Sequence, residues 1–197
     1  TDGFSARISI VVAITIMQLN INAGVRLLSL KDTGALRTLG ATPLRRSTFL
    51  ASEATYRMLI TLVQCVLLMI AGMIAFDVTV EGNPFILILW AVLGSFIFFT
   101  VGYALAAILP SAPVAGNVFM LITFLFIIFS GLFFPLDSLP DWLTSILGYL
   151  PLNQNEIATR MTILGEPLFD YTVVKALLSQ LAYLGIFSFL ASRFKWS

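Results

Sequence analysis

Hydrophobic residues in this chain come in long runs that carry no charged residue, the longest extending from residue 82 to residue 136. A bilayer core about 30 Å thick is crossed by a helix of about 20 apolar residues. The spacing of the runs predicts an all-α fold, a polytopic transmembrane helical bundle that forms a single domain over residues 1–197. Five spans are expected, at about residues 8–29, 58–76, 85–109, 118–136 and 173–192.

The first predicted span carries a polar stripe. Its members follow i, i+3, i+4 spacing and so share one helix face: Thr15, Gln18, Asn22 and Arg26. Lipid offers no hydrogen-bond partner to an amide, so such side chains face protein or water. Two interpretations remain open, packing against another helix and lining of a transport path.

The second and third predicted spans carry weaker signals. Gln64 continues a stripe that begins with Glu53 and Arg57, an i, i+4 pair of opposite charge at the membrane entrance. In the third span, Gly102 and Ala106 are spaced for close approach of another helix. These positions predict contacts between helices, and Gln64 is a further candidate for the path or an interface.

Composition agrees with a membrane protein, with 59% hydrophobic residues, 11% charged residues and a mean hydropathy of +0.99. Cys65 is the single cysteine and histidine is absent, which removes the commonest general base and metal ligand. No phosphate-binding Gly-x-x-x-x-Gly-Lys-Ser/Thr motif occurs. We therefore expect no catalytic residues, no cofactor or metal in this chain, and no nucleic-acid partner.

Charge is distributed unevenly between the predicted connections. If the amino end lies outside, the inner segments are residues 30–57, 110–117 and 193–197. With Arg26 they hold eight of the eleven Lys and Arg residues, which leaves three outside: Arg7, Arg160 and Lys175. By the positive-inside rule, we expect a multi-pass integral membrane protein with residues 30–57 and the C-terminus in the cytoplasm.

The loop 30–57 is longer than a turn and contains a short predicted helix, Asp32–Ala41. Asp32 or Thr33 is suited to cap its start, and Thr42 with Pro43 to end it. Leu36 and Leu39 share a face. So short a helix is marginal alone in water, and it needs a surface on which to lie, either anionic lipid headgroups or a partner.

A second unusual region follows the fourth span, over residues 135–165. It is apolar, yet prolines and glycines divide it. A helix is expected from near Pro140 to near Gly148, within a re-entrant or interfacial hairpin on the outer face. Residues 155–164 predict an amphipathic helix with Ile157, Met161 and Leu164 on one side.

This layout resembles the membrane-spanning permease of type-2 ABC transporters, over about residues 8–195. The resemblance rests on the order and spacing of five segments: Asn20–Arg26, Lys31–Leu44 (KDTGALRTLGATPL), Ser130–Leu136 (SGLFFPL), Leu139–Leu143 and Leu150–Leu152. It implies six spans in the full subunit, the first of them preceding Thr1. It also implies a second permease copy or paralogue as partner, and ABC ATPase subunits that bind ATP and magnesium.

The resemblance further implies roles for individual residues. The residues that couple to the ATPase would be Asp32, Thr33, Gly34, Leu36, Arg37, Leu39, Thr42 and Pro43. An outer gate would include Pro135, Pro140, Trp142 and Pro151. The implied function is export driven by ATP, in a membrane expected to be the inner or plasma membrane of a prokaryote.

Two alternatives to export stay open at this point. One is a non-transporting membrane assembly protein of the same fold, which would bind an ATPase without moving a substrate. The other is an integral membrane enzyme that modifies lipids, using outer carboxylates such as Asp137, Asp141 or Glu156.

Overall fold

The computed structural model describes residues 2–40, 45–76, 79–130, 140–167 and 170–192. In these ranges the chain is helical, as the sequence predicts. The elements follow in the order α1 (Asp2–Ile21), α2 (Ala23–Asp32), α3 (Ala35–Gly40), α4 (Arg46–Phe76), α5 (Pro84–Ile108), α6 (Ala112–Ile128), α7 (Asp141–Leu147), α8 (Pro151–Ile163) and α9 (Tyr171–Ala191).

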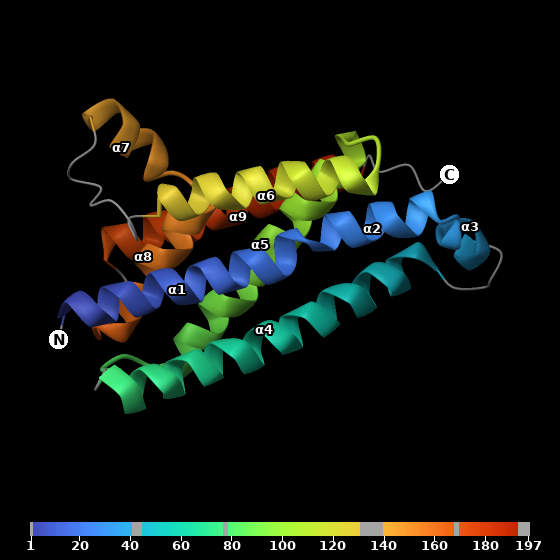
Figure 1. Cartoon of the computed structure of the whole chain (residues 1–197). Helices are drawn as coiled ribbons and strands as arrows, with labels where there is room; N and C mark the ends of the chain where they lie inside the picture. Colours follow the sequence, from blue (N-terminus) through green and yellow to red (C-terminus); the bar gives the residue numbers. More distant parts are fainter. Residues whose placement is uncertain (1, 41–44, 77–78, 131–139, 168–169, 193–197) are drawn as a thin grey trace.

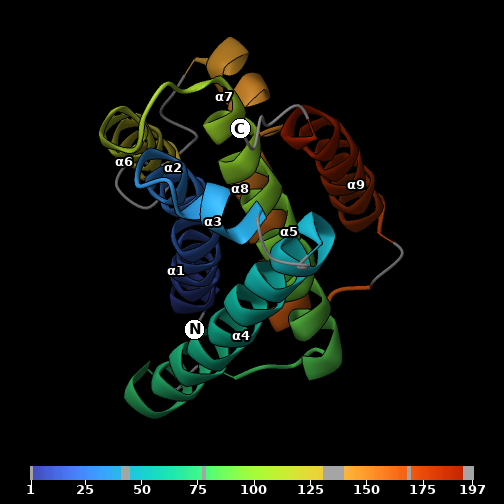
Figure 2. The same ribbon diagram turned by 90° about the vertical axis from the view of Figure 1, so that its right-hand side faces the viewer.

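The long helices run side by side along one direction, and α5 crosses among them at an angle (Figure 1). Helix α5 is central, since it contacts α1, α2, α4, α8 and α9. Helices α4 and α9 lie at the edges of the bundle (Figure 2). Helix α3 and the α5–α6 turn lie at one end, while α7, α8 and the start of α5 lie at the other.

Four helical stretches in the described residues are long and apolar enough to cross a membrane: Arg7–Asp32, Ser47–Ala75, Pro84–Ile108 and Tyr171–Ala191. Helix α6 is shorter, with 17 residues. It begins six residues before the predicted fourth span and ends at Ile128, and residues 131–136 of that span lie outside the described residues.

Local sequence explains where the helices begin. The Asn83 side chain accepts a hydrogen bond from the backbone N–H of Phe85, and Pro84 occupies the first helical position of α5. The Asp170 carboxylate does the same for the N–H of Thr172 at the start of α9. Such caps satisfy the amide groups that a helix start leaves unpaired.

Two glycines bring the backbones of α2 and α5 into contact, where the sequence predicts close packing at Gly102. A Cβ atom placed on Gly24 would lie 2.1 Å from the Gly102 carbonyl oxygen. One placed on Gly102 would lie 2.3 Å from the Ile21 carbonyl oxygen. Ala106, one turn further along α5, is also buried. This crossing fixes the bend between α1 and α2 against the central helix.

Candidate coupling helix and transport path

A short turn separates α2 from α3. Helix α2 ends at Asp32, and Gly34 takes a left-handed conformation with φ of 74°. Thr33 Oγ1 donates to the Ser29 carbonyl oxygen at 2.9 Å. The predicted helix Asp32–Ala41 is therefore too long at its start. Asp32 and Thr33 complete α2, and α3 begins only after the glycine turn, because a left-handed residue cannot lie within a right-handed helix.

Leu36 anchors α3 to the bundle. It is 4% exposed and belongs to a buried cluster with Leu27 and Leu28 of α2 and Phe99 of α5, against which Phe49 of α4 packs. Leu36 of α3 thus rests on this chain itself. Its other surface includes the exposed Thr38.

The structure describes only some of the remaining residues that were predicted to couple to the ATPase. Thr33 is exposed. Arg37 and Leu39 lie in α3, but their side chains are outside the description, and Thr42 with Pro43 lies outside the described residues.

Asp32 has a partner that local sequence does not suggest. Its carboxylate Oδ2 accepts a hydrogen bond of 2.8 Å from the backbone N–H of Ala112, at the start of α6. A carboxylate at a helix start is favoured by the unpaired N–H groups there and by the helix dipole. Asp32 is one of the two residues expected to cap the short helix, and it instead bonds the start of α6, which links α2 to α6 at the end of the bundle that carries α3.

An ionic cluster joins α4 to the bend between α1 and α2. Glu53 Oε1 lies 2.8 Å from Arg57 Nε, as the i, i+4 spacing predicts, and 3.6 Å from Arg26 Nη1. The side chains of Glu53 and Arg57 are largely buried, while that of Arg26 is half exposed. Arg57 also donates through Nη1 to the Leu19 carbonyl oxygen, near the end of α1. The bend is therefore held by charged groups from α4.

Apart from Arg26, which lies beside Glu53 of α4, the predicted polar stripe of α1 and α2 faces away from the bundle of this chain. Gln18 and Asn22 are exposed and Thr15 is half-buried. The hydroxyl of Thr15 and the amide of Asn22 each donate to a carbonyl one turn earlier in their own helix. On α4, Gln64 is likewise exposed. These four side chains are available to water, lipid or another chain.

The buried amide of this region is Asn20, which lies off the stripe. It is 1% exposed, and its Nδ2 donates to the Ile16 carbonyl oxygen and, at 3.0 Å, to Thr61 Oγ1 of α4. Thr61 in turn donates to the Arg57 carbonyl oxygen. Asn20 and Thr61 thus make a second polar contact between α1 and α4, beside that of Arg57 with Leu19. Periodicity identified the stripe, but not which face of the helix is buried.

At the opposite end, α7 has the bounds that its proline and glycine predict. Pro140 precedes the helix and Gly148 follows it. Trp142 is 66% exposed, and Pro151 is buried at the first position of α8. Pro135 lies outside the described residues. The described gate residues therefore lie at or in two short helices, α7 and α8, of which α7 presents an exposed aromatic side chain.

Helix α8 differs from the amphipathic helix expected over residues 155–164. It begins earlier, at Pro151, and its buried residues include many polar ones. Asn153 Nδ2 donates to the Leu147 carbonyl oxygen and Gln154 Nε2 to that of Gly148. These amides satisfy carbonyl groups that the end of α7 leaves unpaired, which explains why they are buried.

Polar side chains also fasten α8 to two spans. Asn155 Nδ2 donates to the Trp90 carbonyl oxygen of α5, and Trp90 Nε1 donates to Thr162 Oγ1 at 3.1 Å. Ser9 Oγ of α1 donates to Glu156 Oε1 at 2.9 Å. Because these bonds join residues 65 to 147 positions apart, no local sequence signal could have identified them.

Of the three carboxylates named as alternatives for catalysis, Asp137 lies outside the described residues, and Asp141 and Glu156 do not form a catalytic arrangement. Glu156 is occupied by Ser9 and by Arg160, whose Nε lies 3.2 Å from Oε1. Burial raises the pKa of Glu156, against the lowering effect of Arg160 and of the Ser9 hydrogen bond. Asp141 is exposed in the first turn of α7. The described part of the chain holds no group of three His, Cys, Asp or Glu residues suited to a metal.

The fold and this geometry define a class, a multi-span helical membrane domain with a short helix anchored between two of its spans. A family model described as ABC-2 type transporter matches residues 1–154. The chain therefore belongs to the ABC-2 type transporter membrane family, whose members are transport subunits that generally pair with ABC ATPase subunits. No curated protein and no solved structure matches the chain.

Proposed function

We propose that this chain is the permease subunit of an ATP-driven exporter, and that α3 is the helix through which an ABC ATPase acts on it. ATP and magnesium would bind to the ATPase, and a second permease copy or a paralogue would complete the transport path. The observation that carries the proposal is the attachment of α3. Leu36 places α3 in a buried cluster with residues of α2 and α5, against which residues of α4 pack, while Thr38 stays exposed.

The contacts around α3 support a lever-like mechanism. Force applied to α3 passes through Leu36 into the cluster shared by α2, α4 and α5. The Glu53 cluster ties α4 to the bend between α1 and α2, and Asp32 ties α2 to the start of α6. Packed helices change between discrete arrangements and do not deform continuously. A displacement of α3 would therefore move these helices together.

Orientation follows from the same proposal. An ATPase is a cytoplasmic protein, so the end of the bundle that carries α3 and the α5–α6 turn would face the cytoplasm of a prokaryotic cell. Helices α7 and α8 would then lie on the outer side (Figure 1). This agrees with the charge distribution, because Lys31 and Arg45 belong to the α3 end.

The coupling role is tested by a charge on the exposed side of α3. We expect Thr38→Asp to reduce severalfold the amount of ATPase that copurifies with the tagged chain from its own membrane, and the ATPase turnover with it. Thr48→Asp is the matched control, since Thr48 is also an exposed threonine, one turn into α4. Equal ATPase recovery and turnover in both variants would reject α3 as the coupling helix. An ATPase that copurifies with the wild type but turns over without transport would favour the assembly protein.

The transport path is tested separately. We propose that Gln18 and Asn22 line it, because they are exposed polar side chains on a membrane span. Gln18→Ala and Asn22→Leu should lower transport without changing ATPase recovery, whereas Leu67→Ala, on the exposed side of α4, should leave transport unchanged. Full transport in the first two variants would assign these residues to a packing role.

A further inference from the structure

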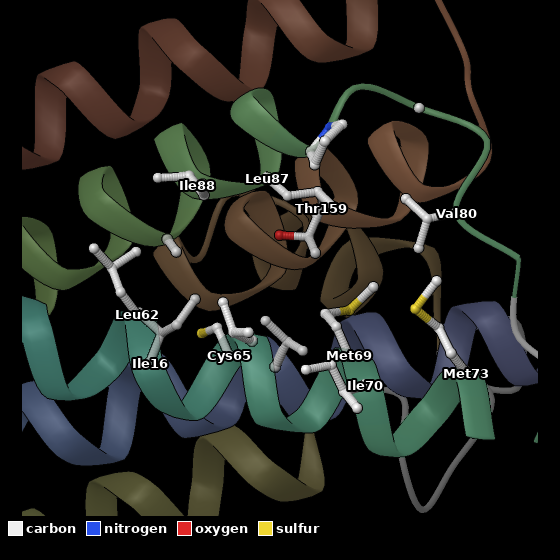
Figure 3. Close-up of a pocket in the computed structure, with 15 residues that line it drawn as sticks. Ile16, Leu62, Cys65, Met69, Ile70, Met73, Val80, Leu87, Ile88 and Thr159 are labelled. Atoms are coloured by element: carbon white, nitrogen blue, oxygen red, sulfur yellow. The ribbon is translucent and has the colours of Figure 1, made fainter. Parts of the chain in front are cut away.

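An apolar cavity of about 360 Å³ lies between α1, α4 and α5, near the α4–α5 connection. Its walls include Ile16 of α1, Cys65 and Met69 of α4 and Leu87 of α5 (Figure 3). Thr159 of α8 closes its inner side. No residue of the coupling helix or of the polar stripe lines it, so the cavity is a feature separate from the proposed function.

One face of α4 lines this cavity along its length. The lining residues of α4 follow i, i+3, i+4 spacing from Leu62 to Met73. The eleven helical rises from Leu62 to Met73 extend about 16 Å, which is about half of a hydrocarbon core ~30 Å thick. The cavity therefore has the depth of one leaflet, and it ends at Val80 and Pro84, where the chain leaves α4 and enters α5.

The cavity is narrow and opens sideways. The volume of about 360 Å³ extends along about 16 Å of α4, so the cavity is a narrow groove, whereas a helix is about 10 Å across. A second helix therefore does not fit, but an extended hydrocarbon chain does. The side chains at the rim, Val66, Ile70 and Ile88, are 43–49% exposed. They belong to two membrane spans, so at this depth the surrounding medium is the hydrocarbon of the bilayer.

The chemistry of the walls excludes most other ligands. Among the described residues that line the cavity, the polar side chains are those of Cys65 and Thr159, and none of the lining residues is charged. A polar or charged ligand would lose its hydration without gaining partners, which is costly. An alkyl chain has no hydrogen bonds to lose, and it makes dispersion contacts with the sulfur atoms and branched side chains around it.

We propose that this cavity is a binding site for one acyl chain of a membrane lipid, from the leaflet that surrounds the α4–α5 connection. The methyl end of the chain lies beside Leu62 and its carboxyl end beside Met73 and Val80. Because the site lies away from α3, the proposal does not depend on an ATPase partner or on the direction of transport.

The wild-type chain provides the first test. It is reconstituted in phosphatidylcholine vesicles that contain a small share of phosphatidylcholine with a photoactivatable diazirine on one acyl chain. After illumination, adducts are mapped by mass spectrometry. A diazirine near the methyl end should label Leu62 and Cys65, and one near the carboxyl end should label Met73 and Val80. Adducts confined to the outward residues of α4, such as Ile74, at either diazirine position would overturn the proposal.

A matched pair of variants gives the second test. Val66 lines the cavity, while Val63, one turn away on α4, is 60% exposed and does not line it. Val66→Phe should fill the cavity and reduce adducts on Cys65 at least threefold, whereas Val63→Phe should leave them within a factor of about 1.5. Equal labelling in both variants would show a lipid on the general protein surface and overturn the proposal. If Val66→Phe does not fold, the depth pattern of the wild type decides alone.

Discussion

The contact between α2 and α5 makes a prediction that can be worked out from distances. Replacing Gly102 by Ala adds one Cβ atom, 2.3 Å from the Ile21 carbonyl oxygen, 3.0 Å from its carbonyl carbon and 3.2 Å from its Cα. All three atoms belong to the backbone, so no side-chain rotation relieves the clash. Ordinary contact with a Cβ begins at about 3.4 Å, and the helices must therefore separate by about 1 Å.

The cost of that separation has two parts of opposite sign. A methyl group inserted into a tightly packed site costs about 1–3 kcal/mol, and a gap of about 1 Å also weakens dispersion contacts of Ile21 with Ile97 and Val101. Against this, Ala favours a helix over Gly by about 1 kcal/mol. Because backbone atoms cannot yield, we expect the upper half of the packing cost and a net loss of about 1–2 kcal/mol.

The assay is the free energy of unfolding in mixed detergent micelles. Gly185→Ala in α9 is the control, because a Cβ there meets no atom within 4 Å and only the helix preference changes. The two variants should differ by about 2–3 kcal/mol. Gly24→Ala should lower the free energy of unfolding about as much as Gly102→Ala does. The double variant should lower it by less than the sum of the two single losses, because the first methyl group already separates the helices. A Gly102→Ala variant as stable as Gly185→Ala would refute the close crossing.

Two further predictions concern buried charge. Glu53→Gln removes the negative centre shared by Arg57 and Arg26 and should lower the free energy of unfolding by about 2 kcal/mol, the usual cost of losing a hydrogen bond between charged groups. If Arg57→Gln costs the same and the two losses add in the double variant, the pair is not coupled. Burial raises the pKa of Glu156, so the native state binds its proton more tightly than the unfolded state. Its contribution to stability is full below the ordinary pKa near 4.5 and is lost as the pH rises through the raised value. The stability difference between the wild type and Glu156→Gln should therefore fall as the pH is raised above 4.5, and a constant or rising difference would contradict this.

Local sequence determined much of the secondary structure, for identifiable reasons. Charge-free runs end where a span must end, so α5 at Pro84–Ile108 and α9 at Tyr171–Ala191 lie within two residues of expectation. Helix α7 starts and stops at Pro140 and Gly148 because these residues act within one turn. Glu53 and Arg57 meet because they are neighbours on one helix.

The tertiary structure decided which polar groups are buried and with which partners they form hydrogen bonds. Asp32 was one of two candidates to cap the short helix, but its partner is Ala112, 80 residues away. The stripe through Gln18 was the visible polar pattern of α1, yet Asn20 is the buried amide, because Thr61 of α4 reaches that face.

The buried amides of α8 and the cavity likewise depend on contacts between different helices. The amides of α8 are buried because the end of α7 and the side of α5 supply their partners, and the cavity exists only where α1, α4 and α5 diverge. Sequence alone thus determined that the chain spans a membrane, where most of its helices lie, and which residues share a face. In a chain whose helices are apolar on all sides, periodicity does not distinguish the face that meets protein from the face that meets lipid. Only the packing of the helices made that distinction.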